Sequence, residues 1–246
     1  MYPTLDLFGL DIQLFGLFLG IAFLVAGWMV ARRLQELGRP ADLAYEMVFA
    51  ALVGGIVGAK LWYLAENGGP LFSGTGLTFY GGLIGGALAV IAWTSYRGAL
   101  DLKLADAVVP SLAAAYAIGR IGCQFAGDGD YGKDWDGPWA MSYPDGTVPI
   151  DTPVHPTPIY ETLAMGAFAI VLWRLRDRFR PGVLSGIYLV GVGVERFLVE
   201  FLRRNEPIAL GLTQAQWVSV GFMIAGALLL VWLRRDRVSA PATRTA

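Results

Sequence analysis

Residues 12–33 read IQLFGLFLGIAFLVAGWMVARR, and this stretch decides the class of fold. Twenty residues without a charged side chain are followed directly by Arg32 and Arg33. A helix that crosses a bilayer needs about 20 mostly apolar residues, so the stretch is long enough to span. No basic residue precedes it, as one would in a cleavable signal peptide. The sequence therefore predicts a membrane-spanning helix with a basic stop-transfer flank.

The composition of the whole chain favours an integral membrane protein. Of 246 residues, 55% are hydrophobic and only 16% are charged, whereas a soluble domain usually has about 25% charged residues. A net charge of −1 without a basic domain excludes a nucleic-acid binder. Cys123 is the only cysteine, which excludes a disulfide-stabilised secreted fold.

Seven apolar stretches are long enough to cross a bilayer. They cover residues 12–31, 45–65, 78–96, 105–123, 157–176, 183–203 and 212–233. We therefore expect an all-α polytopic membrane protein, with a single seven-helix domain over residues 1–237. Residues 124–156 form a long loop with Trp135 and Trp139 that suits an interfacial cap on the outer side. Residues 238–246 are expected to be a disordered cytoplasmic tail.

Lysine and arginine counts predict the orientation. Alternate loops and the C-terminal tail hold thirteen of the 19 basic residues, and the opposite loops hold three. Cytoplasmic loops carry the excess of Lys and Arg in membrane proteins. The seven spans therefore run from an outside N-terminus to a cytoplasmic C-terminus.

Glycines in the second and third spans favour close helix packing. Gly54 with Gly58, and Gly82 with Gly86, are spaced as small-xxx-small pairs, which let helix backbones approach in a membrane. Gly81 and Gly82 also begin a span beside Tyr80, where backbone N–H groups at a helix start can bind an anion.

The ionisable residues within spans carry the functional signal. A charged residue at the centre of a span costs about 2.5–3.5 kcal/mol on insertion scales, so it needs a partner or a task. Arg196, Glu200 and Arg203 are spaced to share one helix face, and Arg120 ends another span with no acid nearby in that span. One interpretation is an internal ladder of ion pairs. The other is a site for a phosphate, which guanidinium groups bind bidentately, and the anion at that depth is a phospholipid headgroup.

No metal and no cofactor is expected. His155 is the only histidine, and it cannot build a zinc site with one distant cysteine. The run Asp128-Gly129-Asp130 lacks the ligand spacing of a 12-residue calcium loop. Cys123 is interpreted as a small packing residue, since the sequence shows no base to activate it as a nucleophile.

An ordered set of motifs resembles the bacterial prolipoprotein diacylglyceryl transferase family. Residues 79–85 are similar to its F-H-G-G-L-I-G segment, and residues 119–132 to its G-R-x-G-N-F-x-N-G-E-x-x-G signature. Residues 155–161 resemble its H-P-x-x-x-Y-E motif, and residues 185–203 its S-G…R-x-x-x-E-x-x-R helix. The resemblance runs from the first span to the last.

The resemblance implies an enzyme of the bacterial inner membrane that acts on lipid and protein. Such an enzyme moves the diacylglyceryl group of phosphatidylglycerol to the lipobox cysteine thiol of a preprolipoprotein signal peptide, and glycerol phosphate leaves. Alternatives from the sequence are a related lipid-modifying transferase with another acceptor, or a phospholipid-binding or transport protein without catalysis. Paired broken helices in matching halves, which favour a transporter, are not evident.

The chain departs from the family pattern at several positions. The family histidine before the Gly-Gly pair is Tyr80, and the asparagine after the G-R-x-G run is Cys123. Family tyrosines correspond to Phe15 and Val192, and a family arginine to Lys60. Residues 127–132 contain one residue more than the family motif. We therefore expect a divergent member.

Site residues follow from the motifs and from the charges together. Catalytic roles are predicted for Arg120, Arg196, Tyr80 and Glu200. Phosphatidylglycerol binding is predicted for Arg120, Gly81, Gly82, Lys60 and Arg203. Candidates for a general base or for the acceptor site are Asp128, Asp130, His155 and Glu161.

Overall fold

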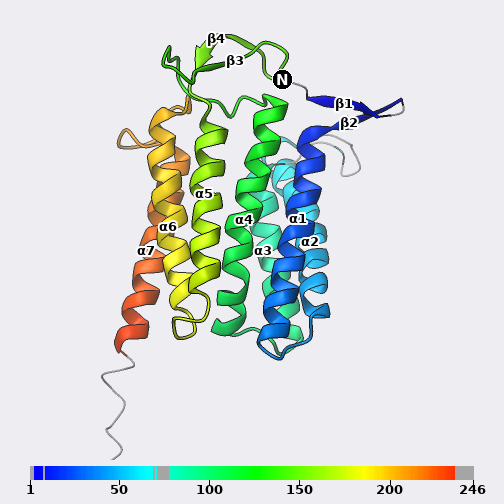
Figure 1. The fold of residues 1–246 in the computed structure, drawn as a ribbon, viewed down its shortest axis with the longest axis vertical. Helices are drawn as coiled ribbons and strands as arrows, with labels where there is room; N and C mark the ends of the chain where they lie inside the picture. Colours follow the sequence, from blue (N-terminus) through cyan, green and yellow to red (C-terminus); the bar gives the residue numbers. More distant parts are fainter. Residues whose placement is uncertain (1–2, 8, 69, 71–77, 236–246) are drawn as a thin grey trace, which may run out of the picture. The chain divides into compact units, whose positions relative to one another are not determined.

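The computed structural model describes residues 3–7, 9–68, 70 and 78–235, and this part contains seven α-helices (Figure 1). The helices are α1 (Leu14–Glu36), α2 (Asp42–Asn67), α3 (Phe79–Tyr96), α4 (Leu102–Ala126), α5 (Thr157–Leu175), α6 (Val183–Val199) and α7 (Gln214–Arg235). Two antiparallel strand pairs accompany them: β1 (Thr4–Leu7) with β2 (Leu10–Gln13), and β3 (Met141–Tyr143) with β4 (Ile150–Val154). The predicted tail, residues 238–246, lies outside the described residues.

Five of these helices, α1, α2, α4, α5 and α7, are long and apolar enough to cross a membrane. The other two are shorter, with 18 residues in α3 and 17 in α6. Large apolar side chains such as Leu24, Phe49 and Leu228 are each more than 60% exposed. An apolar surface of this kind needs an apolar surrounding. The prediction of a polytopic, mostly helical membrane protein is therefore confirmed.

The predicted end of the sixth span is wrong by four residues. Helix α6 ends at Val199, a 3₁₀ turn η1 (Glu200–Leu202) follows, and Arg203 has extended backbone dihedrals. The physical reason is pairing with the long loop, because Gly132 forms a bridge with Arg203 and Lys133 N–H donates to Leu202 O. Arg203 therefore does not share a continuous helix face with Arg196.

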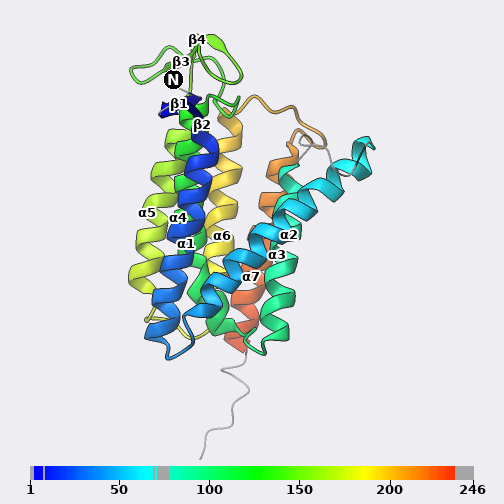
Figure 2. The same cartoon turned by 90° about the vertical axis from the view of Figure 1, so that its right-hand side faces the viewer.

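The long loop also has strands of its own, which the sequence analysis missed. Strands β3 and β4 lie beyond the end of α4 and the start of α5 in both views (Figures 1 and 2). Tyr143 and Val154 are fully buried there, and the ring of Tyr143 stacks on Tyr131 with centroids 5.0 Å apart. The loop is therefore packed around a small core of its own.

The described chain divides into two compact units, Ala26–Ala105 and Met1–Val25 with Asp106–Ala246. In the first unit, α2 and α3 pack closely through glycines. A Cβ on Gly58 would lie 2.7 Å from the Gly85 Cα, and a Cβ on Gly54 would lie 2.6 Å from the Gly85 carbonyl oxygen. The predicted role of Gly54 and Gly58 in helix packing is confirmed. In the second unit, α4, α5 and α6 share a core that includes Ala113, Met165 and Leu184.

Replacement of Gly58 by alanine should destabilise the protein by about 1–3 kcal/mol, because the added methyl group meets backbone atoms that cannot rotate away. The midpoint of thermal unfolding in detergent measures the effect. Gly20→Ala is the matched control, since a Cβ there meets nothing within 4 Å. Equal midpoints for the two variants would contradict the packing.

Candidate anion site

Three arginines from separate segments converge on one buried carboxylate. Glu161 Oε2 lies 3.2 Å from Arg120 Nε and 3.5 Å from Arg203 Nη1, and Glu161 Oε1 lies 3.3 Å from Arg196 Nη1. The Glu161 side chain has no exposed surface. We call Arg120, Arg196 and Arg203 the arginine cluster. Its members were predicted to act together, and the structure brings them together.

Helix ends position these side chains. Glu161 lies in the second turn of α5, where Pro158 occupies one of the first two helical positions. Proline is favoured there because the first N–H groups of a helix have no partner within it. Arg120 lies near the end of α4, and Arg196 in the last turn of α6. The three guanidinium groups and Glu161 therefore lie at the end of the helices that faces the long loop.

Glu200 forms a second buried partner for the cluster. Its Oε2 lies 2.8 Å from Arg196 Nη2, and its side chain is fully buried. Its Oε1 accepts hydrogen bonds from Thr213 Oγ1 at 2.8 Å and from Asn205 Nδ2 at 2.7 Å. These bonds fix the carboxylate, which in turn orients Arg196.

Asp130 bridges two members of the cluster from the long loop. One carboxylate oxygen pairs with Arg120 and the other with Arg203. Burial acts to raise the pKa of Asp130, but the charges of Arg120 and Arg203 outweigh it and hold this pKa below its ordinary value. Asp130 is therefore ionised at neutral pH.

Within the described part of the chain, each member of the arginine cluster forms ion pairs with carboxylates. Three arginines face three carboxylates, namely Asp130, Glu161 and Glu200. The sequence allowed two interpretations of these charges, an ion-pair ladder and a phosphate site. The ion pairs are present, and they link different helices and the loop rather than following one helix face. Arg120 has acids close by, which α5 and the long loop supply.

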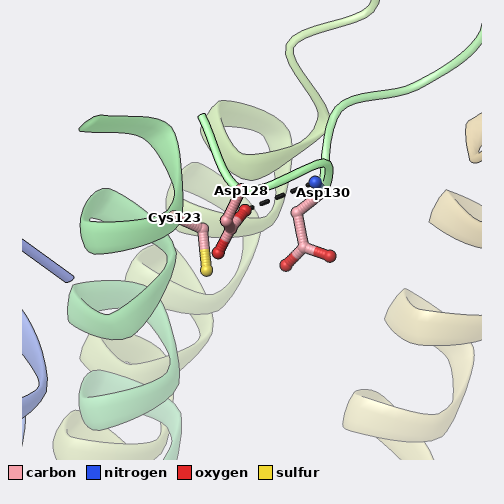
Figure 3. A group of neighbouring side chains, drawn as sticks. All are labelled: Cys123, Asp128 and Asp130. Atoms are coloured by element: carbon pink, nitrogen blue, oxygen red, sulfur yellow. Dashed lines mark hydrogen bonds between the residues drawn. The ribbon is translucent and has the colours of Figure 1, made fainter. Parts of the chain in front are cut away.

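Cys123, Asp128 and Asp130 form a second group of polar atoms beside the cluster (Figure 3). Their sulfur and carboxylate oxygens lie within 4.8 Å of one another, close enough to suit a metal ion. However, both carboxylate oxygens of Asp130 already pair with arginines, and a cation would have to compete with these. Burial, together with the charge of Asp130, raises the pKa of Asp128. A metal ion in this group would therefore have to displace an arginine from Asp130.

His155 lies among aromatic rings of the loop and of α5. Its ring stacks on Trp135 with centroids 4.5 Å apart, and its Nδ1 lies 3.2 Å from the Tyr160 hydroxyl. That hydroxyl also accepts a hydrogen bond from Trp139 Nε1 at 2.8 Å. Within the described part of the chain, His155 forms no hydrogen bond with the arginine cluster.

Lys60, Tyr80, Gly81 and Gly82 belong to the unit Ala26–Ala105. The Lys60 side chain is buried, with Nζ 5.5 Å from the centroid of Tyr63. The Gly82 N–H donates to Thr78 O at 3.1 Å, so it is already used in the first turn of α3. A side chain on Gly81 would meet Thr78 Oγ1 at 2.8 Å, which makes close packing a sufficient reason for this glycine. Their roles with lipid stay predictions.

The sequence analysis missed the polar residues that hold the carboxylates. Tyr116 donates from its hydroxyl to Glu161 Oε1 at 2.8 Å. Thr213 and Gln216 cap the start of α7 reciprocally, since Thr213 N–H donates to Gln216 Oε1 and Gln216 N–H donates to Thr213 Oγ1. A Thr-x-x-Gln pattern before an apolar run is a capping-box signal. Tyr116 lies four residues before Arg120 on the same helix, and this spacing was the available signal that Tyr116 shares a helix face with Arg120.

Comparison with known proteins identifies the family. The profile of the prolipoprotein diacylglyceryl transferase family matches residues 3–232. The chain belongs to this family. It is 33% identical to a phosphatidylglycerol–prolipoprotein diacylglyceryl transferase of Methylibium petroleiphilum, over 94% of this chain and 96% of that protein. It is 30% identical to phosphatidylglycerol–prolipoprotein diacylglyceryl transferase 2 of Clostridium perfringens, over 91% of this chain and 92% of that protein. The resemblance inferred from the motifs is confirmed.

Replacement of Glu161 by glutamine should destabilise the protein by about 3–5 kcal/mol, because it removes the carboxylate from three buried guanidinium groups. Tyr116→Phe removes one hydrogen bond to the same carboxylate and should cost about 1 kcal/mol. Thermal unfolding of the purified protein measures both. Glu206→Gln, at an exposed position, is the control, and a Glu161→Gln midpoint equal to that of this control would contradict the account.

Proposed function

We propose that the chain transfers the diacylglyceryl group of phosphatidylglycerol to the thiol of a lipobox cysteine in a preprolipoprotein signal peptide, with release of glycerol phosphate. Membership of the family and the names of its relatives support this activity. The observation that carries the proposal is the convergence of three guanidinium groups at the loop end of α4, α5 and α6. Such an array suits the phosphate of an anionic lipid.

The proposed setting is the bacterial inner membrane, with seven spans and the N-terminus outside. The seven helices of the described part and the asymmetry of Lys and Arg support it. This orientation places the arginine cluster and the long loop toward the outer leaflet. A secreted signal peptide presents its cysteine on that side. We further propose that residues 1–237 form one catalytic domain, with residues 124–156 as its cap.

The proposed reaction is a direct displacement. The acceptor thiolate attacks the glyceryl carbon that bears the phosphate, a carbon–sulfur bond forms, and the carbon–oxygen bond to phosphate breaks. Negative charge grows on the leaving glycerol phosphate, and Arg120, Arg196 and Arg203 stabilise it. Glu161 and Glu200 keep the guanidinium groups in position by their ion pairs. No cofactor is required by this step.

The acceptor thiol needs a base, because a free thiol has a pKa of about 8.5 and is mostly protonated at neutral pH. Glu161 is a weak candidate, since its side chain is fully buried and forms ion pairs with three arginines. Asp130 is held ionised by two arginines, and His155 lies in the aromatic group of the loop. We assign the base to Asp128, because its pKa is raised by burial and by the charge of Asp130. Tyr80 is proposed to donate a hydrogen bond to the lipid phosphate.

A transferase with a different acceptor is the second candidate function. Tyr80 and Cys123 stand where the family motif has histidine and asparagine. Changes of residue type in these motifs favour a change of acceptor over a loss of the lipid donor, because the three arginines that suit the phosphate are present.

Purified protein should release glycerol phosphate from phosphatidylglycerol only when a peptide with a lipobox cysteine is present. The measurement is enzymatic detection of glycerol phosphate, together with the mass of the peptide. A peptide with serine in place of the cysteine is the control, because its hydroxyl group is far less acidic than a thiol. Release without any peptide would favour water or lipid as the acceptor, and no release would contradict the transferase.

Arg120→Ala and Arg196→Ala should each lower the rate of transfer at least about 100-fold, as loss of a donor to developing negative charge does. Cys123→Ser should retain most activity, because the proposed displacement forms no bond to this sulfur. Arg178→Ala, at an exposed position after α5, is the matched control. Loss of activity in Cys123→Ser alone would indicate a covalent intermediate instead.

A further inference from the structure

The guanidinium groups that would bind a phosphate are already paired with carboxylates. The three guanidinium groups of the arginine cluster face three carboxylates. A phosphate diester adds one negative charge, and an uncompensated charge in a buried site costs several kcal/mol. The added charge is offset when one of the paired carboxylates leaves as the phosphate enters.

Glu161 and Glu200 are held too firmly to leave. Both side chains are fully buried and lie on helical turns. Glu161 also accepts a hydrogen bond from Tyr116, and Glu200 accepts from Thr213. Displacement of either carboxylate would leave several buried donors without a partner.

Asp130 differs from these two in each respect. It lies in the loop after α4, and 27% of its side chain is exposed. Its two carboxylate oxygens pair with Arg120 and Arg203, one oxygen on each guanidinium group. A phosphate diester also presents two equivalent oxygens on one central atom. It can therefore bridge the same two guanidinium groups in the same manner.

The backbone at Asp130 is anchored to the rest of the protein, whereas its partly exposed carboxylate is held by ion pairs to Arg120 and Arg203. The Asp130 carbonyl oxygen accepts a hydrogen bond of 2.5 Å from the hydroxyl of Thr157, which is fully buried at the start of α5. Gly132 donates its N–H to His155 O at 2.8 Å and has no room for a side chain, since a Cβ there would lie 2.6 Å from Leu202 O. The carboxylate can therefore leave the arginines by side-chain rotation, without movement of the loop.

We propose that the Asp130 carboxylate and an anionic phosphate are alternative occupants of one position, between Arg120 and Arg203, and that the phosphate binds by displacing Asp130. The inference rests on the proposed function for the identity of the lipid donor. For a phosphate diester, which carries one negative charge as the Asp130 carboxylate does, the exchange conserves the charge between Arg120 and Arg203. In the absence of a phosphate, Asp130 supplies the negative charge between Arg120 and Arg203.

Equilibrium binding to the full-length protein tests the exchange. The probes are free sn-glycerol 1-phosphate and nanodiscs that contain phosphatidylglycerol, without any acceptor peptide. Asp130→Asn removes the competing charge and keeps the side-chain shape. If the carboxylate holds the position about nine-tenths of the time, its removal should tighten binding about tenfold. Tighter binding of free glycerol phosphate alone would support exchange with a soluble ligand, and tighter binding of the nanodiscs would support exchange with a lipid headgroup.

Asp134→Asn is the matched control. Asp134 lies in the same loop and also pairs with an arginine, but that arginine is Arg204, outside the cluster. The Asp134→Asn variant should bind either probe with the same affinity as the unmodified protein. Equal or weaker binding by a folded Asp130→Asn variant would overturn the inference, because it would show that Asp130 supports the site rather than competes for it.

A second measurement uses the unmodified protein and does not depend on folding of the variant. Carbodiimide labelling of Asp130, read by mass spectrometry relative to Asp134 in the same sample, should rise several-fold when sn-glycerol 1-phosphate is added. An unchanged or lower ratio would overturn the exchange. Neither the binding measurement nor the labelling requires transfer of the diacylglyceryl group. A protein that shows the exchange but no transfer would therefore refute the proposed function and leave the exchange supported.

Discussion

The structure depends on one carboxylate, that of Glu161, among three guanidinium groups. Arg120, Arg196 and Arg203 come from the end of α4, the end of α6 and the segment after η1, and all contact this side chain. A charge on a membrane-embedded helix is costly unless it is paired. The pairing therefore does two things at once. It lowers the free-energy cost of placing the arginines near the membrane, and it connects α4, α5 and α6 at one point.

The long loop is part of this arrangement because it is tied to the same helices. Gly132 pairs with Arg203, and Thr157 at the start of α5 holds the carbonyl oxygen of Asp130. The same pairing explains why α6 ends before the predicted end of the span, since the chain after η1 is extended and pairs with the loop. A loop attached at both sides can hold the Asp130 carboxylate against two arginines while the side chain stays partly exposed.

The sequence predicted what depends on composition and length, and it failed where partners are distant in the chain. Each of the seven apolar stretches overlaps one of the helices α1 to α7, because apolar length alone marks a membrane helix. Strands β3 and β4 were missed, since three and five residues give too short a pattern. Asp130 and Glu161 were chosen only as possible bases, because no sequence spacing shows that they face arginines from other segments. Tyr116 and Thr213 were missed for the same reason.

An anion site inside a membrane protein has to solve two opposed problems. Free arginines would bind phosphate strongly but would be costly to insert and to keep apart. Arginines fully enclosed by fixed carboxylates would be stable but closed to any anion. The cluster combines both kinds of partner, with two buried acids on helical turns and one partly exposed acid in a loop. The fixed acids set the geometry of the guanidinium groups. The loop acid supplies the negative charge that a phosphate can replace, so that binding changes the partner of the arginines without changing their charge balance.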